Sequence, residues 1–143
     1  MSIDNNLYEK SIKILTDLIA FKTISGQDNS NLIDYCEKIL NNIGVDTFKV
    51  YDDDKKRVNL FGTLKEKNQS TKKPIILSGH TDVVPVSKGW SSDPFVATIK
   101  NDKLYGRGSC DMKGFIACTL AYAPIFKESN SDRDLHFCYT FDE

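Results

Sequence analysis

Several features that mark whole classes of protein are scarce or missing in this sequence. Its 143 residues include only four cysteines and two histidines, and the formal net charge is -1. No apolar run approaches the roughly 18 residues of a membrane-spanning helix. The N-terminus has no basic stretch followed by an apolar one, so we expect no signal peptide. A near-neutral chain without a basic block is a poor candidate for binding nucleic acid or an anionic membrane. In the absence of a signal peptide we expect a cytoplasmic protein.

The four cysteines are too widely spaced to form a C-x-x-C pair or a small disulfide framework. They are Cys36, Cys110, Cys118 and Cys138. Three of them stand in segments with an apolar pattern, so we expect reduced thiols in a reducing compartment, acting mostly as small core residues. The spacings also argue against a structural zinc finger.

The apolar pattern predicts alternating helices and strands. The apolar fraction is 40% and the charged fraction 27%, which is ordinary for a globular domain. Helical spacing occurs in residues 7–20, 32–43 and 112–126. Strand patterns occur in residues 45–51, 58–64, 75–77 and 135–141, and a hairpin is expected from 95–100 and 103–105. This order predicts an α/β fold in which helices flank a mixed sheet.

Two of these segments carry more detail. The run at 75–77 is continuously apolar, which is typical of a strand buried on both faces. The last strand, 135–141, alternates between apolar and polar residues, and no helix follows to cover it. We therefore expect residues 1–143 to form an incomplete domain.

His80 and Asp82 are the first candidates for chemistry. His80 comes just after the strand predicted at 75–77, at the strand end where α/β proteins place ligands. An imidazole there can bind a metal ion through one nitrogen, while a carboxylate two residues away accepts a hydrogen bond from the other nitrogen. A surface histidine beside a surface aspartate accounts for the same spacing, and for this pair alone it is the commoner case.

Asp111 stands in a second suggestive segment. Three glycines between Gly106 and Gly114 predict a tight backbone path, with positive φ or a close approach of two chains. Asp111 lies there, near the start of an apolar helix, where the helix dipole alone favours a carboxylate. The alternative is a ligand whose two oxygens bridge two cations.

Glu143 completes the set. At the end of the last strand it can act as a general base toward a metal-bound water, or it can be an exposed residue at the chain end. One histidine, two aspartates and one glutamate at loop ends after strands together predict a hydrolytic metal site.

Longer motifs around these residues resemble a known family. The segments Ser78–Val86, Trp90–Phe95 and Leu104–Phe115 are similar to motifs of the acetylornithine deacetylase / succinyl-diaminopimelate desuccinylase family of zinc peptidases. The last four residues, Thr140–Glu143, resemble the start of its paired-glutamate motif. The opening helix and the Thr23–Gly26 loop are similar as well, so the resemblance covers the whole chain.

The resemblance implies that residues 1–143 are the N-terminal part of a metal-dependent, zinc-peptidase-like catalytic domain, which holds two zinc ions that cobalt can replace. His80 would bind one ion, Asp111 would bridge both, Asp82 would orient His80, and Glu143 would be the general base. The family's second glutamate and its distal ligands would follow residue 143. The smaller inserted domain that usually carries the homodimer contacts would be missing too, so we expect the 143-residue chain alone to be inactive.

The resemblance also implies a substrate, a small N-acylated amino acid. Residues 90–95 and 111–117 look more like the deacetylase branch, which implies removal of an acetyl group from N-acetylornithine in arginine biosynthesis. One alternative is a desuccinylase or a dipeptidase of the same family. The other is a non-catalytic fragment that serves as an interaction module.

Four further residues stand outside this set of candidates. We interpret His136 as structural, since it alternates along a strand and lies in no motif. Cys110 is expected to be a small loop residue and Trp90 a packing residue. Lys113 could position its loop, neutralise carboxylates or be solvated.

Overall fold

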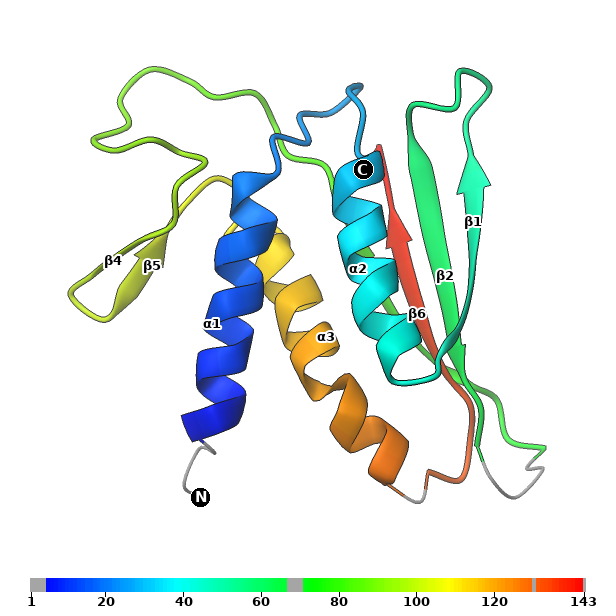
Figure 1. Ribbon diagram of the computed structural model, residues 1–143. Helices are drawn as coiled ribbons and strands as arrows, with labels where there is room; N and C mark the ends of the chain where they lie inside the picture. Colours follow the sequence, from blue (N-terminus) through cyan, green and yellow to red (C-terminus); the bar gives the residue numbers. More distant parts are fainter. Residues whose placement is uncertain (1–4, 67–70, 130, 143) are drawn as a thin grey trace.

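The computed structural model describes residues 5–66, 71–129 and 131–142 (Figure 1). Three helices form, α1 (Asn5–Ala20), α2 (Ser30–Asn42) and α3 (Lys113–Glu128). The strands are β1 (Asp46–Tyr51), β2 (Val58–Leu64), β3 (Ile75–His80), β4 (Thr98–Lys100), β5 (Lys103–Tyr105) and β6 (Leu135–Thr140). Within these ranges no helix is long and apolar enough to cross a membrane. The helices, the strands and the hairpin predicted from the sequence are all present.

Four strands form one sheet in the order β1-β2-β6-β3. The pairs β1–β2 and β2–β6 are antiparallel, whereas β3 runs parallel to β6. The predicted α/β fold with a mixed sheet is thus confirmed. Because β3 and β6 are parallel and His80 is in register with Thr140, the carboxyl ends of both strands meet at one edge of the sheet.

The hydrophobic core lies between the sheet and the three helices, which pack on one of its faces (Figure 1). The alternation along β6 places Phe137 and Tyr139 in this core with no exposed surface. The Tyr139 hydroxyl forms a hydrogen bond of 2.7 Å with the Thr119 hydroxyl on α3. Leu18 from α1 and Leu60 from β2 are also fully buried in the same cluster. The core therefore fixes α1 and α3 relative to the strand ends that carry the candidate site.

The burial predicted for β3 is wrong within the described part of the chain. Ile75 is 47% exposed and Ile76 57% exposed. Among the described strands β3 has β6 as its only neighbour, and the helices cover only one face of the sheet (Figure 1). A continuous apolar run indicates that a strand tends to be buried, but it does not predict which elements pack against the strand.

The cysteines differ from the prediction as well. All four are free thiols, but only Cys36 is buried, Cys138 is half-buried, and Cys110 and Cys118 are exposed. Cys118 lies in an apolar helix, between Ala117 and Thr119, yet it points away from the core. Small apolar residues occur on both sides of α3, so its pattern does not distinguish the inner side from the outer one.

Candidate active site

His80 and Asp111 meet beside the carboxyl end of β3. The Nε2 atom of His80 lies 2.9 Å from Oδ1 of Asp111, although the two residues are 31 positions apart in the sequence. The His80 side chain is 11% exposed and that of Asp111 is 76% exposed. At this distance a proton or a metal ion must lie between the imidazole nitrogen and the carboxylate oxygen. The structure therefore brings together the two residues predicted as metal ligands, whose roles as ligands stay a prediction.

Asp82 lies on the other side of the imidazole ring. The Nδ1 atom of His80 is 3.1 Å from the backbone oxygen of Asp82 and 3.6 Å from its carboxylate oxygen Oδ1. The closer acceptor is thus the carbonyl group, and the carboxylate lies just beyond hydrogen-bond length. Both acceptors favour a proton on Nδ1, which leaves Nε2 as the nitrogen that can bind a metal ion.

Glycines allow the Asp111 segment to approach His80. Gly108 has a φ of 80°, and a Cβ atom there would lie 2.7 Å from the Val83 side chain. A Cβ atom on Gly114 would lie 2.4 Å from the backbone oxygen of Ser109. Both distances are too short for any side chain, so the predicted tight path is confirmed. The peptide bond between Asp111 and Met112 is cis.

Lys113 attaches the glycine-rich segment to the end of α1. Its side chain has no exposed surface, and its Nζ donates hydrogen bonds to the backbone oxygens of Leu18 at 2.9 Å and Phe21 at 2.7 Å. These carbonyl oxygens lie at the C-terminal end of α1, where the helix dipole favours a cation. Burial lowers the pKa of Lys113 to about 8. The suggestion that Lys113 is solvated is therefore wrong, and its contacts support the suggestion that it positions the loop.

A buried polar network beside the site is not predicted by the sequence. It joins the loop between α1 and α2 to the segment after β3. The Thr23 hydroxyl donates to the Thr81 backbone oxygen at 2.6 Å, and the Asn29 amide donates to the Thr81 hydroxyl at 2.9 Å. The Ser25 hydroxyl donates to Oδ2 of Asp82 at 2.5 Å. The signals for it are small polar residues after a helix and the family resemblance of the Thr23–Gly26 loop, and these predict no more than a polar loop.

Asn29 is the centre of this network. It precedes the first residue of α2, but its side chain does not cap that helix. Instead its Oδ1 accepts a hydrogen bond from the Val58 backbone nitrogen at 2.8 Å, and its Nδ2 donates to the Val58 backbone oxygen at 3.0 Å. The residue is only 2% exposed. One amide therefore links α2, β2 and the segment that follows His80.

We expect the replacement of Asn29 by alanine to lower the free energy of unfolding by about 3–4 kcal/mol, because both backbone groups of Val58 would be buried without a partner. Urea denaturation of the intact protein measures this change. Asn42 provides a matched control at the exposed end of α2, where the same substitution should change stability by no more than about 0.5 kcal/mol. Equal effects at the two positions would contradict the role given to Asn29.

The end of β6 is fixed at the same edge of the sheet. The Phe141 backbone nitrogen donates to the Asn59 side chain at 2.9 Å. Asp142 forms an ion pair with Arg57, which also binds Asp52 at 2.8 Å. Glu143 itself lies outside the described residues, so its role as general base stays a prediction.

The donor atoms of the His80–Asp111 pair fit a zinc ion. An imidazole nitrogen and a carboxylate oxygen are ordinary zinc ligands. Two such ligands on a tetrahedral ion, each about 2.0–2.1 Å away, would be roughly 3.3 Å apart, a little more than the 2.9 Å between these atoms. In the described ranges, no three His, Cys, Asp or Glu side chains are grouped closely enough to hold a metal ion. The pair therefore fits as part of a metal site rather than as a whole one.

A cleft opens beside the pair. It is lined by His80, Val83, Val84 and residues 106–111, so one wall is the glycine-rich segment itself. Arg107 in this wall places its guanidinium group 5.3 Å from the centre of the Trp90 ring. Trp90 therefore packs against the wall, as predicted, and the cleft exposes both Asp111 and His80 to a ligand.

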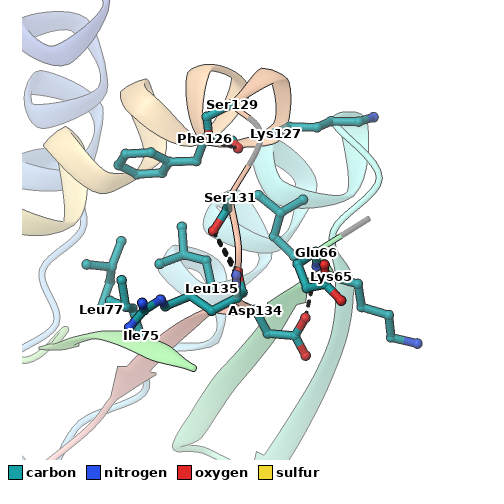
Figure 2. A pocket seen from close by; sticks show the side chains of 12 residues that line it. Lys65, Glu66, Ile75, Leu77, Phe126, Lys127, Ser129, Ser131, Asp134 and Leu135 are labelled. Carbon is teal, nitrogen blue, oxygen red and sulfur yellow. Dashed lines mark hydrogen bonds between the residues drawn. The ribbon is translucent and has the colours of Figure 1, made fainter. Parts of the chain in front are cut away.

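A second, more apolar hollow lies at the other end of β3 (Figure 2). Ile75, Leu77, Phe126 and Leu135 line it, and the hydrogen bond from the Glu66 backbone to Asp134 lies at its rim. Ile75 and His80 are the two ends of the strand, roughly 16 Å apart at the rise of an extended chain. This hollow is therefore separate from the candidate site.

Comparison with known proteins finds similar sequences. Residues 76–143 match the model of peptidase family M20/M25/M40. The succinyl-diaminopimelate desuccinylase of Rickettsia akari (strain Hartford) is 36% identical over 140 residues, which cover 92% of this chain and 35% of that protein. The probable carboxypeptidase S-like 1 of Dictyostelium discoideum is 34% identical over 158 residues, covering 99% of this chain and 32% of that protein. This chain spans about a third of the length of these relatives.

Solved structures show the same fold. Human carnosine dipeptidase 1 superimposes with a TM-score of 0.76 at 22% identity, over 96% of this chain and 32% of that one. The Bacillus subtilis YXEP protein, described as a dinuclear metal binding peptidase from the M20 family, gives a TM-score of 0.68 at 15% identity, over 99% of this chain and 37% of that one.

Over nearly its whole length the chain thus has the fold of these solved peptidases. In sequence, residues 76–143 match the M20 peptidase model, and 92% of the chain is similar to a succinyl-diaminopimelate desuccinylase. These matches agree with the predicted resemblance to a family that includes desuccinylases. The relatives are named desuccinylases and a carboxypeptidase, which agrees with the predicted alternative better than with the predicted deacetylase.

Proposed function

We propose that the protein is a metal-dependent amide hydrolase that acts on a small N-acylated amino acid or peptide. The observation that carries this proposal is the 2.9 Å approach of His80 Nε2 to Asp111 Oδ1 at the carboxyl end of β3. Strand ends at this edge of an α/β sheet are where such proteins bind ligands, and an imidazole and a carboxylate there are ordinary zinc ligands.

Four residues would have separate roles in this reaction. His80 and Asp111 would hold zinc, which lowers the pKa of a bound water toward about 7 and polarises the scissile carbonyl. Asp82 would keep the proton of His80 on Nδ1. Glu143 would take the proton of the attacking water and pass it to the leaving amine. The register of Thr140 with His80 supports this, because it brings the end of β6 to the same edge of the sheet.

Among possible substrates, an N-succinylated amino acid ranks first. Relatives of 35–36% identity that cover 92% of this chain are named succinyl-diaminopimelate desuccinylases. A peptide ranks second, on the likeness to the carboxypeptidase S-like protein. N-acetylornithine ranks third, because it depends on the motifs at residues 90–95 and 111–117 alone.

We expect kcat/KM to be at least about 10-fold higher for N-succinyl-diaminopimelate than for N-acetylornithine. A site that pairs with the extra carboxylate of a succinyl group loses that interaction when an acetyl group replaces it. Initial rates for both substrates, measured on one preparation of the intact protein, test this. A His80→Ala preparation controls for contaminating hydrolases. A higher value for N-acetylornithine would restore the deacetylase interpretation, and hydrolysis of a dipeptide alone would favour the peptidase.

We also propose that the protein acts in the cytoplasm and as a homodimer. The exposed free thiols of Cys110 and Cys118 support the first point, since such thiols persist in a reducing compartment. The second point comes from the family resemblance.

A further inference from the structure

The two carboxylate oxygens of Asp82 have different surroundings. Oδ2 accepts the hydrogen bond of 2.5 Å from the Ser25 hydroxyl. Oδ1 is buried, has no hydrogen-bond partner in the described part of the chain, and lies 3.6 Å from Nδ1 of His80. The residue as a whole is 5% exposed. Since an unpaired buried carboxylate oxygen costs free energy, its direction toward the imidazole needs a cause.

Ser25 supplies that cause because its own position is fixed by the backbone. Its backbone nitrogen donates to the Val83 oxygen at 3.0 Å, and the Val83 nitrogen donates to the Thr23 oxygen at 2.8 Å. These bonds form a parallel bridge between Ile24 and Val83, so the loop runs alongside the segment that contains Asp82. The length of 2.5 Å is typical of a hydroxyl that donates to an ionised carboxylate.

We propose that Ser25 is a positioning residue for the metal centre. By holding Oδ2 of Asp82, it turns Oδ1 toward Nδ1 of His80 and so keeps Nε2 directed at Asp111. The chain of contacts runs from Ser25 through Asp82 to His80. This inference rests on the proposed function, because it assigns the pair of His80 and Asp111 to metal binding.

Zinc affinity of the metal-free intact protein, measured by competition with a chromophoric chelator, tests the inference. Ser25→Ala should weaken zinc binding about 10-fold, at the lower end of the effect of residues that support a ligand. Ser25→Thr keeps the hydroxyl and should restore the affinity to within about 2-fold, since Ser25 lies at the surface and has room for a methyl group. Ser11→Ala is the matched control, because the Ser11 hydroxyl bonds only within α1, to the Leu7 oxygen at 2.9 Å.

A double-mutant cycle separates positioning from a general loss of structure. If Ser25 acts only through the Asp82 carboxylate, Ser25→Ala should change zinc affinity less than about 2-fold when Asp82 is already alanine. The visible spectrum of the cobalt-loaded protein should change with Ser25→Ala in the parent and not in the Asp82→Ala background. An equal loss in both backgrounds, or no rescue by threonine, would overturn the inference.

The same measurements distinguish this inference from the proposed function. If the parent binds zinc, His80→Ala abolishes binding and Ser25→Ala leaves it unchanged, the positioning role is wrong and the metal site stands. If the parent and His80→Ala bind zinc equally weakly, the proposed function fails, and the positioning role fails with it.

Discussion

Replacement of His80 by alanine is expected to lower the zinc affinity of the intact protein by more than about 100-fold. Structural zinc sites with four ligands bind with roughly 10–16 kcal/mol, or about 3 kcal/mol for each ligand, and about 1.4 kcal/mol corresponds to a factor of ten. We expect His80 to contribute about as much as one such ligand, because its Nε2 faces Asp111 directly, at 2.9 Å. Titration of the metal-free protein with zinc measures it.

The sequence offers a matched control in its other histidine. His136 lies on β6, where its Nδ1 is 3.1 Å from the Thr63 hydroxyl and its ring is 5.0 Å from that of Phe61. These contacts are structural, so His136→Ala should leave zinc affinity within about 2-fold of the parent. Equal losses in the two variants would mean that neither histidine is a specific ligand.

Replacement of Glu143 by glutamine is expected to reduce kcat by about 10²–10⁴-fold while the zinc content stays near that of the parent. An amide cannot accept the proton of the attacking water, and general base catalysis typically contributes this factor. Single-substrate kinetics and metal analysis of the same preparation measure both quantities.

Asp142→Asn is the control for this second variant. Asp142 is the adjacent carboxylate and forms an ion pair with Arg57, so its loss removes a charge from the same edge of the sheet. We expect its kcat to change by less than about 3-fold, because a partly exposed ion pair contributes little. Near-normal turnover of Glu143→Gln would remove Glu143 from the mechanism.

The secondary structure could be predicted because its signals are local. The alternation along β6 predicts one apolar face, and Phe137 and Tyr139 on that face are buried in the core. The positive φ of Asn101 and Asp102 in the β4–β5 hairpin agrees with the predicted tight turn. The exposure of Ile76 and Cys118 could not be predicted, since it depends on which elements lie beside them in space.

The candidate site also has a part that the sequence predicts and a part that it does not. The convergence of His80 and Asp111 was predictable because both stand at element ends with long motifs around them. Ser25 and Asn29 could not be found because small polar residues in a loop show no periodicity, and only the fold reveals that they bind the segment after β3 and the start of β2. The choice among acyl groups could not be predicted from motifs that shape the backbone and the metal site.

Zinc-edge anomalous diffraction from crystals of the intact, zinc-loaded protein tests the central claim most directly. We predict an anomalous peak about 2.0–2.2 Å from both His80 Nε2 and an Asp111 carboxylate oxygen, with the two ligand atoms slightly further apart than in the metal-free geometry. A zinc ion bound at His136 or at a cysteine, with no peak between His80 and Asp111, would contradict the assignment of this pair as the metal site.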